Sequence, residues 1–189
     1  MRPALLLLAG DPRAGVPGLT GDPALADGLL GAALDVARAT GGVGRVLLFS
    51  PPEAEAGLTA RSLGFRLWPA DGDTDGARWA NAFRQAGELG YEGAIVMGLA
   101  SAGITAERLT EVVDLLAAHA GVVIPDTGGD IAVLGLQRPE PTLVPPSPTV
   151  PDLETLRTRA RQLRISVHEL APHPRLSPEA LPDFLATGA

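Results

Sequence analysis

The hydrophobic positions along the chain alternate between short continuous runs and longer stretches with helical spacing. Short apolar runs bounded by Gly or Pro are typical of buried strands, whereas apolar residues that recur every three or four positions indicate helices with one buried face. The predicted strands are residues 4–9, 45–50, 65–68, 94–97, 122–124, 131–136 and 165–170. The predicted helices are residues 23–40, 51–60, 76–89, 105–117, 152–163 and a terminal helix that begins at residue 177.

Strands and helices alternate along most of the chain, which predicts an α/β fold with three layers, α/β/α, around a mostly parallel mixed sheet. Residues 131–136 follow the strand 122–124 after a short turn, so we expect this one strand to run in the opposite direction. The length of 189 residues predicts a single domain over residues 1–189. Residues 137–151 contain six prolines and are expected to form an extended connector that could cover a cleft.

The composition removes several classes of function. The chain has no cysteine, which excludes disulfides, thiolate metal ligands and thiol catalysis. All 15 basic residues are arginine, and 22 acidic residues give a net charge of -7, so nonspecific nucleic-acid binding is not expected. The arginines of residues 157–164 are interpreted first as a solvated helix face, with anion binding as the alternative.

The apolar runs are too short for a membrane protein. All of them fall below the ~20 residues that a helix needs to cross a bilayer. The N-terminal run, residues 4–9, is followed by Asp-Pro-Arg without the small-residue cleavage site of a signal peptide. We therefore expect a cytoplasmic protein with no membrane partner.

Four segments carry motifs that are specific in combination. Gly98–Thr105 is similar to Gly-x-Asp-x-Pro-x-Leu-Thr, and Gly72–Trp79 to Gly-Gly-Asp-Leu-Gly-Glu-Arg-Met. Residues 125–136 have the length and ending of Pro-Ala-x-Asp-Gly-Gly-Tyr-x-Leu-Ile-Gly-Leu, and residues 177–181 parallel Thr-Pro-Glu-Asp-Leu. The chain thereby resembles a bacterial glycosyltransferase-A-like family that is assigned to arsenosugar biosynthesis and is related to 2-phospholactate guanylyltransferase.

The resemblance implies a nucleotide-diphospho-sugar transferase-like fold that holds a nucleotide or nucleotide sugar. In that fold a divalent cation bridges carboxylates and phosphates and neutralises charge on the departing diphosphate. Here Ala100 stands at the first metal-binding Asp, and Pro174, Arg175 and Leu176 stand at a later Asp-x-Asp. The resemblance therefore implies a divergent member with degraded metal-dependent transferase activity. No metal ligand is assigned, and Mg²⁺ or Mn²⁺ is expected only if transfer survives.

The candidate ligand-binding residues are Arg13, Arg78, Ser101, Asp126, Gly128, Gly129 and Asp130. Arg13 is the only cation of the first loop, where the resemblance calls for a phosphate-facing Lys. Arg78 matches the family's Arg and lies one turn into a predicted helix, where a guanidinium suits a phosphate or carboxylate. The alternative is that Arg78 pairs with Asp75 or Glu88 on the same helix. Catalytic residues stay unassigned.

Asp126 and Asp130 flank Gly128 and Gly129 in a predicted turn at the cleft. One interpretation is structural, because Asp side chains in turns accept hydrogen bonds from nearby backbone N–H groups. The other is that these carboxylates bind a cation or a sugar hydroxyl. An active transferase with relocated metal ligands would need such a convergence of carboxylates, whereas a noncatalytic small-ligand-binding or protein-interaction domain would not.

A third hypothesis is a serine hydrolase. Ser101 follows a predicted strand and precedes a predicted helix, as a nucleophile elbow does, although Leu99 replaces the Gly that this motif requires. Asp126 or Asp130 followed by His168 gives the chain order of a catalytic triad. This hypothesis requires Ser101 to lie within hydrogen-bond reach of His168. The oligomeric state is left open by the sequence.

Overall fold

The computed structural model describes residues 2–10, 15–16 and 18–187. Within these residues the strands are β1 (Ala4–Ala9), β2 (Gly44–Phe49), β3 (Arg66–Pro69), β4 (Ala94–Gly98), β5 (Gly121–Pro125), β6 (Ile131–Leu136) and β7 (Val167–Glu169). The α-helices are α1 (Pro23–Ala39), α2 (Glu55–Leu58), α3 (Asp75–Glu88), α4 (Ala106–Leu115), α5 (Leu153–Leu163) and α6 (Leu181–Thr187). Short 3-10 helices are η2 (Pro52–Ala54), η3 (Leu99–Ser101) and η4 (Pro141–Leu143).

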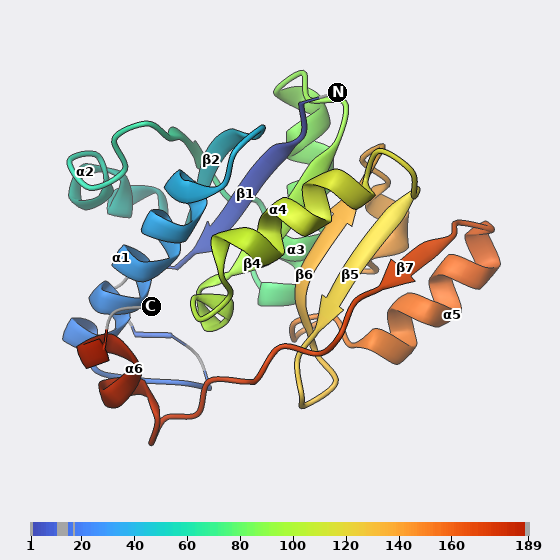
Figure 1. The fold of residues 1–189 in the computed structure, drawn as a ribbon. Helices are drawn as coiled ribbons and strands as arrows, with labels where there is room; N and C mark the ends of the chain where they lie inside the picture. The colour runs from blue at the N-terminus through green and yellow to red at the C-terminus, as the bar shows by residue number, and fades with distance from the viewer. Residues whose placement is uncertain (1, 11–14, 17, 188–189) are drawn as a thin grey trace.

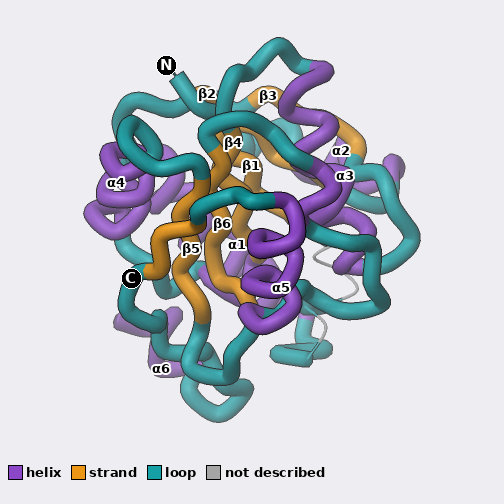
Figure 2. The backbone as a smooth tube through the Cα atoms, turned by 90° about the vertical axis from the view of Figure 1, so that its right-hand side faces the viewer, coloured by secondary structure: helices purple, strands orange, loops and turns teal. Residues whose placement is uncertain are grey.

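The described strands form one mixed sheet in the order β3-β2-β1-β4-β6-β5-β7 (Figure 1). β1 pairs in parallel with β2 and β4, whereas β6 is antiparallel to both of its neighbours, β4 and β5. Helices lie on opposite sides of the strands, as Figure 2 shows for α3 and α4. The α/β three-layer fold with a mostly parallel sheet and one reversed strand is thereby confirmed.

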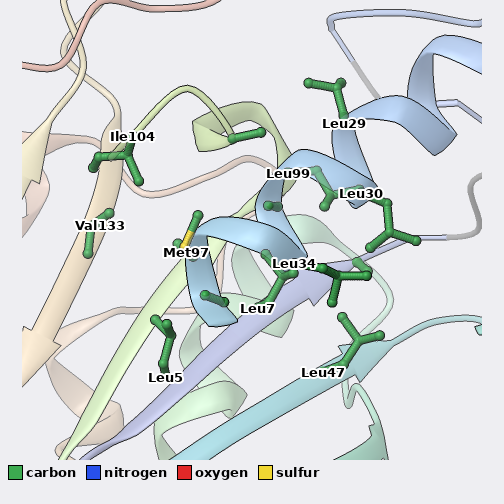
Figure 3. Packing of buried hydrophobic residues seen from close by; sticks show 14 of the residues in the cluster. Leu5, Leu7, Leu29, Leu30, Leu34, Leu47, Met97, Leu99, Ile104 and Val133 are labelled. Carbon is green, nitrogen blue, oxygen red and sulfur yellow. The ribbon is translucent and has the colours of Figure 1, made fainter. Parts of the chain in front are cut away.

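The two faces of the sheet pack into separate hydrophobic cores. Leu5 and Leu7 of β1 point to the core formed with α1 and α4, whereas Leu6 points to the core formed with α3 and α5. Figure 3 shows the first core, in which Leu30 and Leu34 of α1 pack over β1 and its neighbours. Because both faces are buried, each central strand needs a continuous apolar run, which is the pattern that identified it in the sequence.

Polar caps set the beginnings of the long helices. The side chains of Asp22, Thr74, Thr105 and Asp152 accept backbone N–H bonds at the starts of α1, α3, α4 and α5. The predicted terminal helix is placed too early, because Ser177 begins a turn and α6 begins only at Leu181, whose side chain is fully buried. None of the described helices has the length and apolar character needed to cross a membrane.

The Pro-rich connector, residues 137–151, packs along α3. Leu143 and Val144 are buried in the core that α3 and α5 share. Near its end, the connector is tied to the start of α3, where the Thr74 hydroxyl donates to the Ser147 carbonyl oxygen at 2.6 Å. Gly76 faces the same segment, and a Cβ at this position would overlap Ser147 and the Thr149 carbonyl oxygen. The connector therefore becomes a fixed wall beside the first turn of α3.

This contact makes Gly76→Ala a test of the packing. We expect the added methyl group to displace the connector and destabilise the protein by about 1–3 kcal/mol, as overpacking does. The matched control is Gly87→Ala in the same helix, where a Cβ meets no atom within 4 Å. That change should be neutral or stabilising by up to about 1 kcal/mol through helix propensity. Urea unfolding measures both, and equal stabilities of the two variants would contradict the close packing.

Candidate functional site

A cleft of about 390 Å³ lies at the carboxyl ends of the central parallel strands. Its walls come from the end of β1 with residues 15–16, from Ser50 and Pro51 after β2, and from residues 98–100 at the end of β4. The first turn of α3 and Val150 of the Pro-rich connector complete the described lining. Because the chain leaves neighbouring parallel strands on the same edge, this edge is where open α/β sheets bind ligands.

Arg78 lies in this cleft, one turn into α3. Its Nη1 donates to Asp75 Oδ1 at 3.1 Å, and about a quarter of the side chain (26%) is exposed. Its Nε is buried and has no hydrogen-bond partner. The predicted pairing with Asp75 and the predicted position in the cleft therefore occur together. The ion pair orients the guanidinium and leaves a second donor of the same group unpaired.

The described lining of the cleft does not fit a divalent cation. Mg²⁺ requires near-octahedral oxygen ligands, and in such sites carboxylates supply the negative charge. Asp75 is the one carboxylate of the described lining, and Arg78 already neutralises it. Ala100 presents a methyl group where the resemblance places an Asp. Across the part of the chain that the structure describes, no three Asp, Glu or His side chains converge in a way that could hold a metal.

Asp126 shapes the β5–β6 turn, as the structural interpretation predicted. Its Oδ1 accepts the backbone N–H groups of Gly128 at 2.7 Å and of Asp130 at 3.0 Å. Gly129 adopts a φ of 91°, a conformation that side chains disfavour and glycine accepts. Four of the candidate residues, from Asp126 to Asp130, are thus brought together by the requirements of one tight turn.

The sequence did not predict the partner of these carboxylates. Arg175 Nε lies 2.9 Å from Asp126 Oδ2, and Arg175 Nη2 forms an ion pair with Asp130. Gly128 leaves room for this guanidinium, since a Cβ there would overlap Arg175 Nη1. Arg175 had been noted only for standing where an Asp-x-Asp is expected. No signal in the sequence connects it to a turn so distant along the chain.

Ser101 is a buried structural residue. Its side chain is nearly inaccessible, at 6% exposure for the residue, and its hydroxyl donates to the Ala132 carbonyl oxygen at 2.9 Å. His168 lies on β7 and stacks on His119 with ring centroids 4.6 Å apart. The hydroxyl is therefore not paired with His168, and the triad expected for a serine hydrolase is wrong. Arg13 lies outside the described residues.

His173 is a further titratable group beside the β5–β6 turn. Its backbone N–H donates to the Pro125 carbonyl oxygen at 2.8 Å, and its ring is half-buried with an Nε2 that has no hydrogen-bond partner. Burial lowers the pKa of His173, Arg108 lowers it further by charge repulsion, and Asp126 opposes the two effects. The ring therefore resists protonation in the folded protein.

The chain has a glycosyltransferase-A-like fold, structurally similar to that of nucleotide-diphospho-sugar transferases and cytidylyltransferases. A protein of Desulfovibrio desulfuricans G20, assigned as a nucleotide-diphospho-sugar transferase, superposes with a TM-score of 0.80 at 16% identity over 94% of this chain and 83% of that one. CMP:2-keto-3-deoxy-manno-octonic acid synthetase, solved with CTP, gives a TM-score of 0.65 at 13% identity over 99% and 98%. A Mycobacterium tuberculosis H37Rv protein solved with manganese gives 0.55 at 18% over 94% and 91%.

The chain belongs to the bacterial family described as "Uncharacterized protein conserved in bacteria (DUF2064)", whose profile matches residues 33–146, more than half of the chain. No curated protein matches the sequence. The identities to solved structures are low, so these similarities show the fold alone. The CTP and manganese bound in two of these structures are ligands of those proteins and are not assigned to this chain.

The lowered pKa of His173 predicts a pH dependence of stability. The unfolded chain binds a proton at His173 as the pH falls through about 6.5, whereas the folded protein does so only at a lower pH. The free energy of unfolding should therefore decrease as the pH is lowered from about 6.5. Urea titrations of the wild type and His173→Gln across this window measure the effect. The variant should show the shallower dependence, and identical slopes would contradict the assignment.

Proposed function

We propose that this protein binds a nucleotide or nucleotide sugar in the cleft at the ends of β1, β2 and β4 without a divalent cation, and that its group-transfer activity is lost or strongly reduced. The observation that carries the proposal is the replacement of acidic side chains by arginine and alanine. The described cleft offers one guanidinium, Arg78, and a single, already paired carboxylate, Asp75. Such a lining attracts an anionic ligand directly instead of through a bridging metal.

Arg78 is the proposed contact for a phosphate. An ion pair with Asp75 holds the guanidinium in place, while about a quarter of the side chain (26%) stays exposed. A phosphate oxygen that contacts the exposed part of the guanidinium would accept a charge-assisted hydrogen bond. Asp75 reduces the net charge of the pair, so we expect moderate affinity for the anion and a substantial contribution from the rest of the ligand.

The remainder of the described lining is mostly apolar and suits the base or sugar ring of such a ligand. Leu8, Val16, Trp79 and Leu99 contribute apolar surface, and Ser50 lies among them. A volume of about 390 Å³ falls within the roughly 300–1,000 Å³ that is typical of small-molecule sites. The resemblance to glycosyltransferases of arsenosugar biosynthesis makes nucleotide sugars the first ligands to test, and free nucleotides the second.

Reduced transfer follows from the charge that a departing diphosphate develops. A cation that stabilises this charge lowers the activation free energy of such reactions by roughly several kcal/mol. The Ala100 methyl group supplies no ligand, and Asp126 and Asp130 pair with Arg175 outside the described lining of the cleft. Binding by Arg78 alone stabilises ground state and transition state to similar extents, which does not accelerate the chemical step.

The alternative of a protein-interaction domain has no comparable support. In the part of the chain that is described, the large hydrophobic side chains that are exposed are Leu63, in the turn before β3, and Leu163, at the end of α5. We also propose that residues 1–189 form one domain. In support, strands from both ends of the chain share one sheet, and Leu185 of α6 packs against Gly28 of α1.

Thermal denaturation with a panel of nucleotides and nucleotide sugars tests the proposal. A ligand that binds only the folded protein should raise the Tm equally in EDTA and in Mg²⁺ or Mn²⁺, with about 2.7 kcal/mol of stabilisation at a hundredfold excess over its Kd. A shift that requires the metal would contradict metal-independent binding and favour an active transferase. The absence of any shift across the panel would remove nucleotide binding from the proposal.

The variant Arg78→Gln tests whether Arg78 contacts the phosphate of the ligand. Removing the guanidinium should weaken the binding of phosphate-containing ligands about 10- to 100-fold, as expected for a charge-assisted hydrogen bond of about 1.5–3 kcal/mol. The matched control is Arg84→Gln, because Arg84 lies on the same helix and pairs with Asp71 and Glu88 away from the cleft lining. Titration calorimetry with the ligand found above measures both variants. Equal affinities would exclude Arg78 as the anion contact.

A further inference from the structure

Residues 170–177, which form most of the segment between β7 and α6, cross the loop end of β5 and β6; we call them the C-terminal strap (Figure 1). Its backbone is hydrogen-bonded along the β5–β6 turn. Thr127 N–H donates to the His173 carbonyl oxygen at 3.0 Å, and Arg175 N–H donates to the Thr127 hydroxyl at 3.1 Å. These bonds fix the origin of the Arg175 side chain directly beside Asp126 and Asp130.

The two carboxylates of the turn differ in how firmly they are held. The Asp126 side chain is 13% exposed, and its Oδ1 is fixed by two backbone N–H groups, which leaves Oδ2 facing Arg175. The Asp130 side chain is 35% exposed and points its Oδ2 at the same guanidinium. Two negative groups therefore share one cation, and the turn keeps them together whether or not that cation is present.

We propose that the Arg175 guanidinium is the built-in counter-cation of Asp126 and Asp130, and that it fills a position that would otherwise bind a divalent cation. The sequence resemblance implies a metal, and in this chain one guanidinium, which is covalently attached, already pairs with both carboxylates of the turn. Arg175 thus joins the C-terminal strap to the β5–β6 turn and makes this connection independent of metal. The inference does not rest on nucleotide binding.

Removing the guanidinium should expose a cation site. Without Arg175, the fixed Asp126 and the nearby Asp130 repel each other, and an oxygen-seeking divalent cation relieves this repulsion by bridging them. A site with two carboxylates is expected to be weak, with a Kd on the order of 1 mM, similar to weak protein calcium sites.

Mn²⁺ binding, measured by electron paramagnetic resonance and by the Tm, tests the proposal in Arg175→Ser. We expect this variant to bind Mn²⁺ at least about tenfold more tightly than the wild type, a difference of about 1.4 kcal/mol, and to gain Tm with added Mn²⁺. Adding Asp126→Asn to Arg175→Ser should abolish the gain. Arg175→Lys should behave as the wild type because it keeps a cation. If Arg175→Ser lacks a native circular dichroism spectrum, Arg175→Gln serves for the same measurement.

A matched control separates this site from an ordinary surface ion pair. Arg84 also bridges two carboxylates, Asp71 and Glu88, but their side chains are about half exposed, at 55% and 49%. Arg84→Ser should therefore not gain Mn²⁺ binding. Equal Mn²⁺ binding by the wild type and Arg175→Ser would overturn the proposal. Mn²⁺ binding by the wild type that is lost in Asp126→Asn would also overturn it, because the guanidinium would then not occupy the site.

Discussion

The structure depends on the parallel pairing of β1 with β2 on one side and β4 on the other. Leu5 and Leu7 of β1 are fully buried on one face and Leu6 on the other, so this strand is held in the middle of the molecule. Because three parallel strands end on the same edge, the residues at their ends line one cleft. The helix α3 and the Pro-rich connector complete its walls.

Arginine side chains pair with carboxylates both in the cleft and at the β5–β6 turn. Arg78 pairs with Asp75 in the cleft, and Arg175 pairs with Asp126 and Asp130 at the turn. A metal-dependent site gathers carboxylates and takes the balancing cation from solution, whereas this chain supplies cations as arginine side chains. The proposal of metal-independent binding rests on this arrangement.

Much of the fold was predictable because short-range rules decide it. Apolar runs identified the strands, and the helix predicted over residues 105–117 is present as α4, with Thr105 as its cap. The terminal helix was misplaced, because a Ser-Pro-Glu pattern is compatible with a single turn, and the burial of Leu181 decides where α6 begins. The serine hydrolase alternative for Ser101 is excluded only by the structure, since a strand–loop–helix setting does not reveal that Ala132, on another strand, accepts its hydroxyl.

The sequence by itself determined the layers of the fold, the reversed strand, the turn at Asp126 and the absence of the acidic residue at Ala100. These features rest on periodicity, local hydrogen bonds and residue identity, all of which are local. Only the tertiary structure decided that Arg175 reaches Asp126 and that the connector forms a wall of the cleft. Such contacts join segments far apart in the chain, and their geometry is fixed by how the whole sheet and its helices pack.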